Sequence, residues 1–223
     1  MCIRDSSGAD GPENWGSLSP EFAECSTGDR QAPIAIDDPD PVKRDSPRLD
    51  YISQMAEVVN NGHSVEAAAG PGSSMTLDGK KYALGRMHFH VPAENIIDGV
   101  QYPAELHFVH ESRDGKAAVL AVMLEEGPEN PAFDAYLDQM DLPVDSETQV
   151  KLPWPDMVPG NTRSIRFDGS LTTPECTQGI AWNVAIAPLQ VSVKQLDTLR
   201  SAYDDNSRPV QPLNGRQLTI DAN

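Results

Sequence analysis

Three histidines lie at a spacing suited to binding one metal ion. His88 and His90 are separated by a single residue in a segment of strand character, and the two-residue period of a strand places both imidazoles on one face. The dipeptide Asp98-Gly99 follows and favours a two-residue hairpin turn between antiparallel strands. An unbulged turn there places His107, on the returning strand, directly opposite His90. The three imidazoles then form a triangle on one face of a sheet.

Three neutral imidazoles with a fourth position left open are typical of a catalytic metal site, because a closed structural site recruits four protein ligands. Imidazole nitrogens favour zinc, although cobalt or nickel could occupy the same site. Glu105 precedes His107 by two residues, so its carboxylate can accept the imidazole N–H that points away from the metal. Alternatively, the three histidines are ordinary surface or core residues, and Glu105 is a solvated carboxylate on a strand. His110 points to the opposite face, as a core or surface residue.

These residues belong to a series of strands separated by Asp-Gly turns. Asp78-Gly79, Asp98-Gly99 and Asp114-Gly115 each lie between segments of strand character. The pattern predicts an antiparallel meander over 75–77, 81–90, 94–97, 100–110 and 117–124. The last segment is apolar throughout, which indicates a strand covered on both faces, and 180–187 is similar.

Helices are few in the predicted structure. Ser192 and Gln195 form a capping box that predicts a helix of about three turns. A shorter helix is expected within 132–140. The proline-rich, acidic stretch 33–47 is expected to be extended surface chain with little regular structure. The fold class is therefore mainly β with peripheral helices.

Length and charge limit the possible partners. The chain has 223 residues, and its 34 acidic and 17 basic residues give a formal net charge of −17. Such a surface repels phosphate backbones and anionic lipids, so we expect no nucleic acid and no membrane partner. No apolar run approaches the roughly 18 residues of a spanning helix. Residues 1–7 read as a non-native N-terminal scar or disordered segment, which leaves 8–223 as a single domain.

Two cysteines remain once the scar is set aside. Cys25 and Cys176 show neither a C-x-x-C motif nor a metal-ligand spacing. They suit one structural disulfide formed in an oxidising compartment, or two buried free thiols.

Seven short motifs occur along the chain in a fixed order: Gly11-Pro12-Glu13-Asn14-Trp15-Gly16, Asn60-Asn61-Gly62-His63, His88-Phe89-His90, Pro92-Ala93-Glu94, Tyr102-Pro103-Ala104-Glu105-Leu106-His107-Phe108-Val109-His110, Leu171-Thr172-Thr173-Pro174 and Asn206-Ser207-Arg208-Pro209-Val210-Gln211-Pro212-Leu213. Together they strongly resemble the α-class carbonic anhydrases, in their bacterial branch. The resemblance covers nearly the whole chain from Gly8.

The resemblance implies a twisted, mostly antiparallel central sheet of about ten strands with a few short helices. It also implies reversible, Zn2+-dependent hydration of carbon dioxide to bicarbonate and a proton, in which zinc-bound hydroxide attacks the carbon. The implied zinc ligands are His88, His90 and His107. Glu105 and Asn206 are implied to keep the metal-binding imidazoles in position without touching the metal. Weak esterase side activity is a further expectation.

The remaining site residues also follow from the resemblance. Thr172 accepts a hydrogen bond from the hydroxide and donates its own to Glu94, which orients the nucleophile. His63 is the proton shuttle, because an imidazole with a pKa near about 6.5 loads and unloads close to neutral pH. Thr173 lines the entrance, and an apolar wall holds CO2: Val109, Val119, Leu171 and Trp182.

The family also suggests ligands, a compartment and an assembly. Sulfonamide and anion inhibitors are expected to bind, and a homodimer is possible. A disulfide between Cys25 and Cys176 matches the bacterial branch, where it steadies the loop that carries Thr172. The protein is therefore expected to be periplasmic or secreted, its signal peptide not being present in this sequence.

Four positions depart from the family pattern. Arg86 replaces a glutamine and cannot accept the N–H of His88. Asn95 replaces a histidine, Glu175 replaces a proline, and the usual N-terminal tyrosine is absent. No zinc ligand is lost, so activity is expected. The alternatives are a catalytically weak, zinc-binding module of the same family, and an ester or peptide hydrolase, which the lack of an H-E-x-x-H motif disfavours.

Overall fold

The computed structural model describes residues 8–203 and 205–222, so the proposed scar at 1–7 lies outside the described residues. The strands are β1 (Ala35–Ile36), β2 (Asp40–Val42), β3 (Arg48–Asp50), β4 (Gln54–Asn60), β5 (Val65–Ala69), β6 (Ser74–Leu77), β7 (Lys80–His90), β8 (Ile96–Ile97), β9 (Val100–Gln101), β10 (Ala104–Ser112), β11 (Ala117–Glu126), β12 (Ser146–Leu152), β13 (Ser164–Ser170), β14 (Gln178–Ala185), β15 (Leu189–Val191) and β16 (Thr219–Asp221). The α-helices are α1 (Trp15–Leu18), α2 (Glu24–Thr27), α3 (Asp134–Leu137) and α4 (Val193–Ala202). Short 3-10 turns are η1 (Gly8–Asp10), η2 (Pro20–Phe22), η3 (Pro131–Phe133) and η4 (Trp154–Met157).

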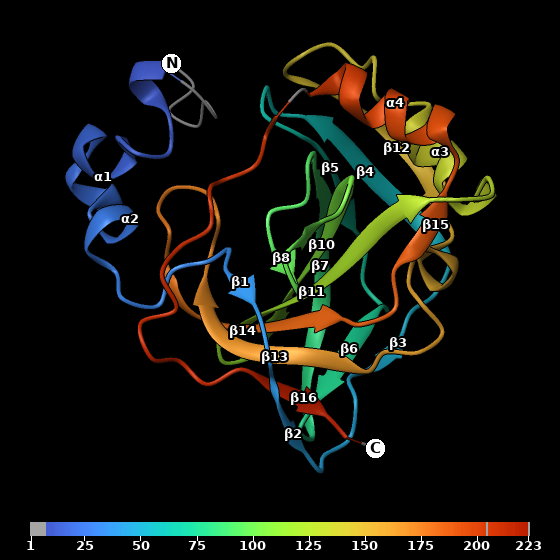
Figure 1. The fold of residues 1–223 in the computed structure, drawn as a ribbon. Helices are drawn as coiled ribbons and strands as arrows, with labels where there is room; N and C mark the ends of the chain where they lie inside the picture. Colours follow the sequence, from blue (N-terminus) through green and yellow to red (C-terminus); the bar gives the residue numbers. More distant parts are fainter. Residues whose placement is uncertain (1–7, 204, 223) are drawn as a thin grey trace.

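One large sheet dominates the molecule (Figure 1). It contains 13 strands, in the order β12-β4-β5-β7-β10-β11-β14-β13-β16-β2, with β15, β3 and β6 attached beside this path. Most neighbours are antiparallel, but β11 runs parallel to β14 and β15, and β16 runs parallel to β2. The predicted mainly β class is confirmed, and the sheet is larger than the expected ten or so strands.

The central strand β11 separates two hydrophobic layers. Successive side chains of a strand point to opposite faces. Leu120 and Val122 accordingly join the cluster on one face, with Met87 and Phe89 of β7. Val119, Ala121 and Met123 join the cluster on the other face. Every residue from 118 to 124 is buried, which confirms the prediction of a strand covered on both faces.

The predicted meander exists, but its hairpin at Asp98-Gly99 belongs elsewhere. Asp98 and Gly99 both have a positive φ, as a two-residue primed turn requires, and Ile97 pairs with Val100. However, β8 and β9 belong to a separate 3-stranded sheet, in which β8 lies between β9 and β1. The predicted continuous strand 100–110 is therefore wrong, because β9 ends at Gln101 and β10 begins at Ala104.

This interruption changes the register that the turn predicts. His107 pairs with His88, and His90 pairs with Glu105, so the predicted pairing of His90 with His107 is wrong by two residues. Irregular chain on both sides of the small hairpin absorbs the difference. Because an even shift keeps every side chain on its original face, the three histidines still face the same side.

The helices lie at the periphery of the sheet. In Figure 1, α1 and α2 lie at one side, and α3 and α4 lie together at another. Ser192 and Gln195 form the predicted capping box of α4. The predicted helix within 132–140 is shorter, a 3-10 turn followed by the four residues of α3. Within the described chain, none of the helices is long and apolar enough to cross a membrane.

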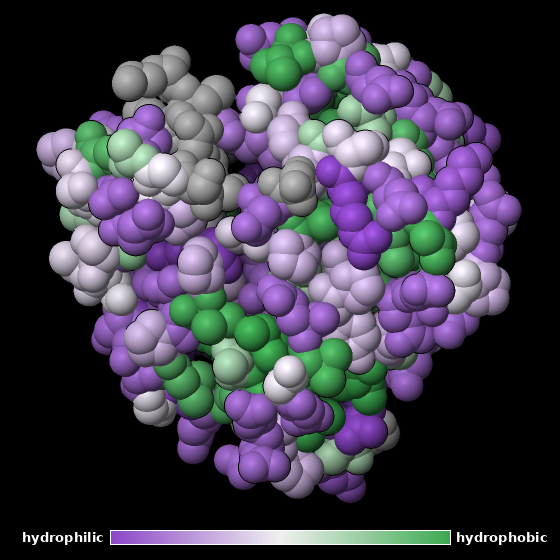
Figure 2. All heavy atoms as spheres, turned by 45° about the horizontal axis from the view of Figure 1, so that its top comes forward, coloured by the Kyte–Doolittle hydropathy of each residue, from purple (hydrophilic) through white to green (hydrophobic). Residues whose placement is uncertain are grey.

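The stretch 33–47 is more ordered than predicted. Ile34 and Ile36 are fully buried, and β1 pairs with β8 while β2 pairs with β16. Figure 2 shows hydrophilic residues over most of the face in view, with hydrophobic side chains gathered in its lower part.

Candidate metal centre

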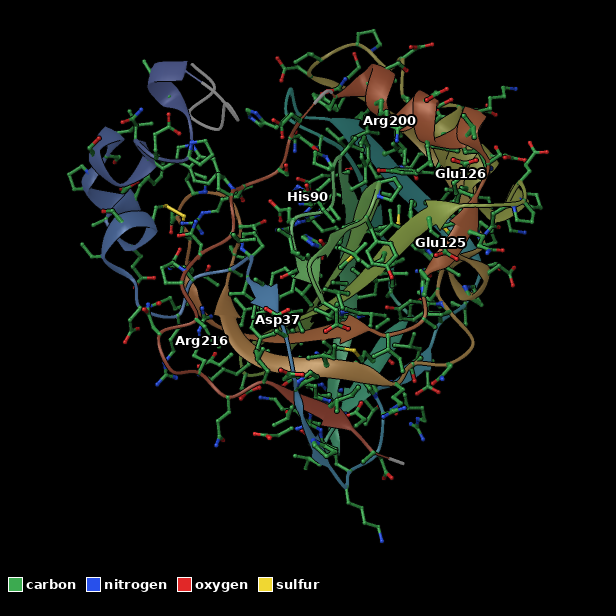
Figure 3. The ribbon with its side chains drawn as sticks, viewed as in Figure 1. Asp37, His90, Glu125, Glu126, Arg200 and Arg216 are labelled. Atoms are coloured by element: carbon green, nitrogen blue, oxygen red, sulfur yellow. A yellow bond between two sulfur atoms is a disulfide. The ribbon has the colours of Figure 1, made fainter. Side chains whose placement is uncertain are left out.

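Three histidine side chains converge where β7 ends. His88 and His90 come from β7, and His107 comes from β10. One ring nitrogen from each lies within 4.8 Å of the corresponding atoms of the other two. His90, labelled in Figure 3, lies within the body of the sheet and is 3% exposed, and His107 is 2% exposed. Within residues 8–203 and 205–222, no other group of three such side chains could hold a metal ion.

Two of the histidines have one ring nitrogen fixed by an acceptor. His90 Nδ1 lies 2.9 Å from the backbone oxygen of Asn206, and His107 Nε2 lies 3.0 Å from Glu105 Oε1. A carbonyl oxygen can only accept, so His90 Nδ1 carries the proton and Nε2 keeps its lone pair. His90 Nε2 is buried and has no hydrogen-bond partner in the structure. Burial also lowers the pKa of both imidazoles, which favours the neutral form that binds metals.

Glu105 is a fully buried carboxylate that accepts four hydrogen bonds. Besides His107, its donors are the backbone N–H groups of Glu94 and Asn95, each at 2.8 Å, and the Asn95 side-chain amide at 2.6 Å. Burial raises the pKa of Glu105, and the hydrogen bonds from Asn95 oppose that rise. Asn95 Oδ1 also accepts the Ile34 N–H at 3.1 Å. Both polar atoms of the amide that stands in place of the family's histidine are therefore engaged in hydrogen bonds.

Glu94 lies beside the same cluster. Its Oε1 accepts the backbone N–H of Arg208 at 2.8 Å and lies 3.4 Å from His90 Nδ1. Burial raises the pKa of this carboxyl group well above its usual range, whereas the nearby Thr172 side chain lowers it. Glu94 Oε2 is buried and has no hydrogen-bond partner in the structure.

The donor set fits a zinc ion. It consists of three imidazoles, two of which have their second ring nitrogen engaged by protein oxygens, and it includes a buried nitrogen lone pair without a partner. Zinc binds histidine nitrogen in three-ligand sites that leave one position open. The open side here is a cavity of about 100 Å³, whose lining includes His63, Glu94 and Thr172.

The residues predicted for the substrate wall fall into two groups. Leu171 and Thr173 line the cavity directly. Val109, Val119 and Trp182 lie side by side on three adjacent strands, because Val109 pairs with Val119 and Val119 pairs with Trp182. The Trp182 ring contacts His107, with 4.9 Å between ring centroids. An apolar layer thus borders the histidine cluster.

The predicted disulfide is present between Cys25, in α2, and Cys176, in the loop that carries Thr172. Figure 3 shows it as a yellow bond near α2. Gln31 Nε2 donates to the Cys176 carbonyl oxygen at 3.0 Å. The disulfide therefore ties the N-terminal helices to the loop beside the cavity.

The sequence assigned no separate role to Arg208, although the residue lies in the motif at 206–213. This buried guanidinium donates to the backbone oxygens of Ala32 and Cys25 at 2.8 and 3.0 Å and lies over the Trp15 ring. Its own N–H holds Glu94, so Arg208 links the disulfide region to the cavity. All of these partners are distant in sequence, and only the motif as a whole signalled the residue.

Comparison with known proteins identifies this arrangement. The model of the family "Eukaryotic-type carbonic anhydrase" matches residues 10–222. The chain belongs to the α-class carbonic anhydrase family. It is 39% identical to a carbonic anhydrase of Pectobacterium atrosepticum over 94% of this chain and 87% of that protein. It is 38% identical to one of Neisseria gonorrhoeae, over 94% of this chain and 84% of that protein.

A solved structure shows the same fold. The α-carbonic anhydrase of Thermovibrio ammonificans, in complex with the inhibitor sulfanilamide, superposes with a TM-score of 0.91 at 38% identity, over 96% of this chain and 97% of that one. The chain is thus an enzyme of the carbonic anhydrase family. Its disulfide and its bacterial relatives are consistent with an extracytoplasmic protein.

Proposed function

We propose that this enzyme catalyses the reversible hydration of carbon dioxide to bicarbonate and a proton with one Zn2+ per chain. The observation that carries this proposal is the convergence of His88, His90 and His107 within 4.8 Å beside an open cavity. A zinc ion held there would supply a nucleophile at neutral pH, because zinc lowers the pKa of a bound water molecule to about 7. Residues 8–223 act as one domain in this account.

The residues behind the histidines fix the ligand geometry. Glu105 holds His107 through Nε2, and the backbone oxygen of Asn206 holds His90 through Nδ1. Each contact sets the tautomer, so the remaining nitrogen points a lone pair toward the cluster. The Asn206 side chain adds hydrogen bonds to the backbone on both sides of His90, which steadies the end of β7.

Thr172 and Glu94 orient the reacting oxygen. The Glu94 carboxyl group is fixed on one side by the Arg208 N–H, which leaves its other oxygen for the Thr172 hydroxyl. When Thr172 donates to Glu94, its oxygen can only accept from a group in the cavity. The acceptor thus selects one orientation of the nucleophile, a form of pre-arranged geometry. Carbon dioxide binds against the apolar wall of Val109, Val119, Leu171 and Trp182, with Thr173 at the entrance.

His63 carries the released proton between the cavity and the solvent. It lines the same cavity as His88 and His90 and is half-buried, so it reaches both environments. An imidazole loads and unloads a proton near neutral pH. Replacement by alanine is expected to slow turnover in weak buffer and to be partly rescued by added imidazole. A His63→Ala enzyme that shows no buffer dependence would remove the shuttle role.

Rapid-mixing CO2 hydration on purified protein tests the proposal. We expect catalysis that chelation and aromatic sulfonamides abolish, and weak ester hydrolysis alongside it. A zinc-loaded sample that leaves the hydration rate at the uncatalysed value would favour the alternative, a catalytically weak zinc-binding module. Sulfonamide binding is supported by the sulfanilamide complex of the Thermovibrio relative. We also propose a periplasmic or secreted location and a homodimer, which cell fractionation and sedimentation velocity can test.

A further inference from the structure

Arg86 and Glu66 form an ion pair at the cavity that holds the three histidines. Arg86 Nε lies 3.2 Å from Glu66 Oε2, with side chains 44% and 26% exposed. The residues come from adjacent strands, β7 and β5, and both line the cavity. Arg86 precedes His88 by two residues and therefore shares its face of the sheet. Arginine stands here in place of the glutamine of the family pattern.

The second oxygen of Glu66 extends this contact to the loop that carries His63. Glu66 Oε1 accepts the Asn61 side-chain amide at 2.7 Å. Asn61 Oδ1 in turn accepts the backbone N–H groups of His63 and Ser64 at 3.0 and 2.9 Å. A continuous series of contacts thus runs from Arg86, through Glu66 and Asn61, to the backbone of His63.

An arginine at position 66 could not complete this series. Glu66 binds a cation with one oxygen and accepts the Asn61 amide with the other, whereas a guanidinium has five donors and no acceptor. Without Arg86, the partly exposed Glu66 side chain regains rotamer freedom, and its hydrogen bond to Asn61 weakens.

We propose that the Arg86–Glu66 ion pair positions His63 for proton transfer. The pair touches no reacting atom, so Arg86 and Glu66 are positioning residues that act through Asn61. This inference rests on the proposed shuttle role of His63. It predicts a defect in the proton-transfer step alone, with CO2 binding and conversion left intact.

The first test separates kcat from kcat/KM. In weak buffer, Arg86→Gln and Glu66→Ala are each expected to lower kcat for CO2 hydration about two- to fivefold, the factor that corresponds to a partly exposed ion pair. We expect kcat/KM to stay unchanged, imidazole to restore kcat, and Arg86→Lys to retain most of it. Arg113→Gln, which removes an exposed arginine from the turn between β10 and β11, is the charge-matched control for Arg86→Gln.

A charge swap separates positioning from simple electrostatics. The double variant Arg86→Glu/Glu66→Arg keeps the ion pair and the net charge, but arginine at 66 cannot accept the Asn61 amide. The proposal predicts that kcat of this variant stays low in weak buffer. Recovery of the wild-type rate would overturn the positioning role.

Amide hydrogen exchange supplies a readout that does not depend on activity. In the zinc-bound enzyme, Glu66→Ala is expected to speed exchange at the His63 and Ser64 amides about two- to fivefold. This is the same factor as the expected loss of kcat. Unchanged exchange together with unchanged kcat would overturn the inference. If instead His63→Ala itself leaves kcat unchanged in weak buffer, the shuttle role in the proposed function fails. If His63→Ala is slow while Arg86→Gln is not, only the present inference fails.

Discussion

Replacing Glu105 by glutamine is expected to weaken zinc binding through a change of tautomer at His107. The buried Glu105 carboxylate accepts from four N–H groups, two at each oxygen. Glutamine offers one oxygen and one NH2 group. On one side, its NH2 group must therefore face N–H groups that donate to the carboxylate in the wild-type protein. If the NH2 group faces His107 Nε2, the imidazole moves its proton to Nδ1, which then has no lone pair for the metal.

The expected loss of zinc affinity is about 10- to 100-fold, or about 1.4 to 2.7 kcal/mol, as for other residues that hold a metal-binding histidine. Competition with a chromogenic chelator at pH 7.5 measures it directly. The matched control is Glu111→Gln, which changes an exposed glutamate of the same strand. Circular dichroism establishes that both variants fold. A folded Glu105→Gln protein with wild-type zinc affinity would refute the reasoning.

Three further predictions concern stability at acid pH, the Cys25–Cys176 disulfide and the Thr172 hydroxyl. Burial lowers the pKa of His110 from 6.5 to about 4, so the unfolded state binds more protons between these pH values, and stability falls by up to about 3 kcal/mol as pH drops through that window. We expect urea unfolding to show that the free energy of unfolding falls less between pH 7 and 4.5 for His110→Gln than for the wild-type protein. An equal fall in the two proteins would contradict this. Cys25→Ser opens a disulfide of sequence separation 151 and is expected to cost about 4 to 5 kcal/mol less any strain, so an unchanged denaturation midpoint would contradict the account. Thr172→Val is expected to lower kcat/KM about 100-fold with zinc content unchanged, and Thr172→Ser is expected to retain most activity; equal rates for the two variants would exclude the hydroxyl's role.

Local patterns in the sequence predicted the parts of the fold that local physics determines. The alternation around His88 and His90, the Asp98-Gly99 turn and the Ser192 capping box all depend on neighbouring residues, and the structure shows each of them. The register of β7 against β10 could not be derived in this way. It depends on how the small sheet of β1, β8 and β9 takes up the chain between them.

The candidate site shows the same division. The histidine cluster and the Glu105 contact follow from two-residue spacings and from an even register shift that preserves faces. Arg208 and Gln31 reach their partners across more than 100 residues, and no local pattern encodes such contacts. Asn95, a departure from the family pattern, keeps two buried hydrogen bonds, which only the structure reveals.

X-ray absorption at the zinc edge, with the metal content of the same sample, tests the central claim most directly. The account predicts one zinc per chain, bound by three imidazole nitrogens at about 2.0 to 2.1 Å and one further light atom. A metal-free native protein, or a spectrum that requires sulfur or fewer than three imidazoles, would contradict it.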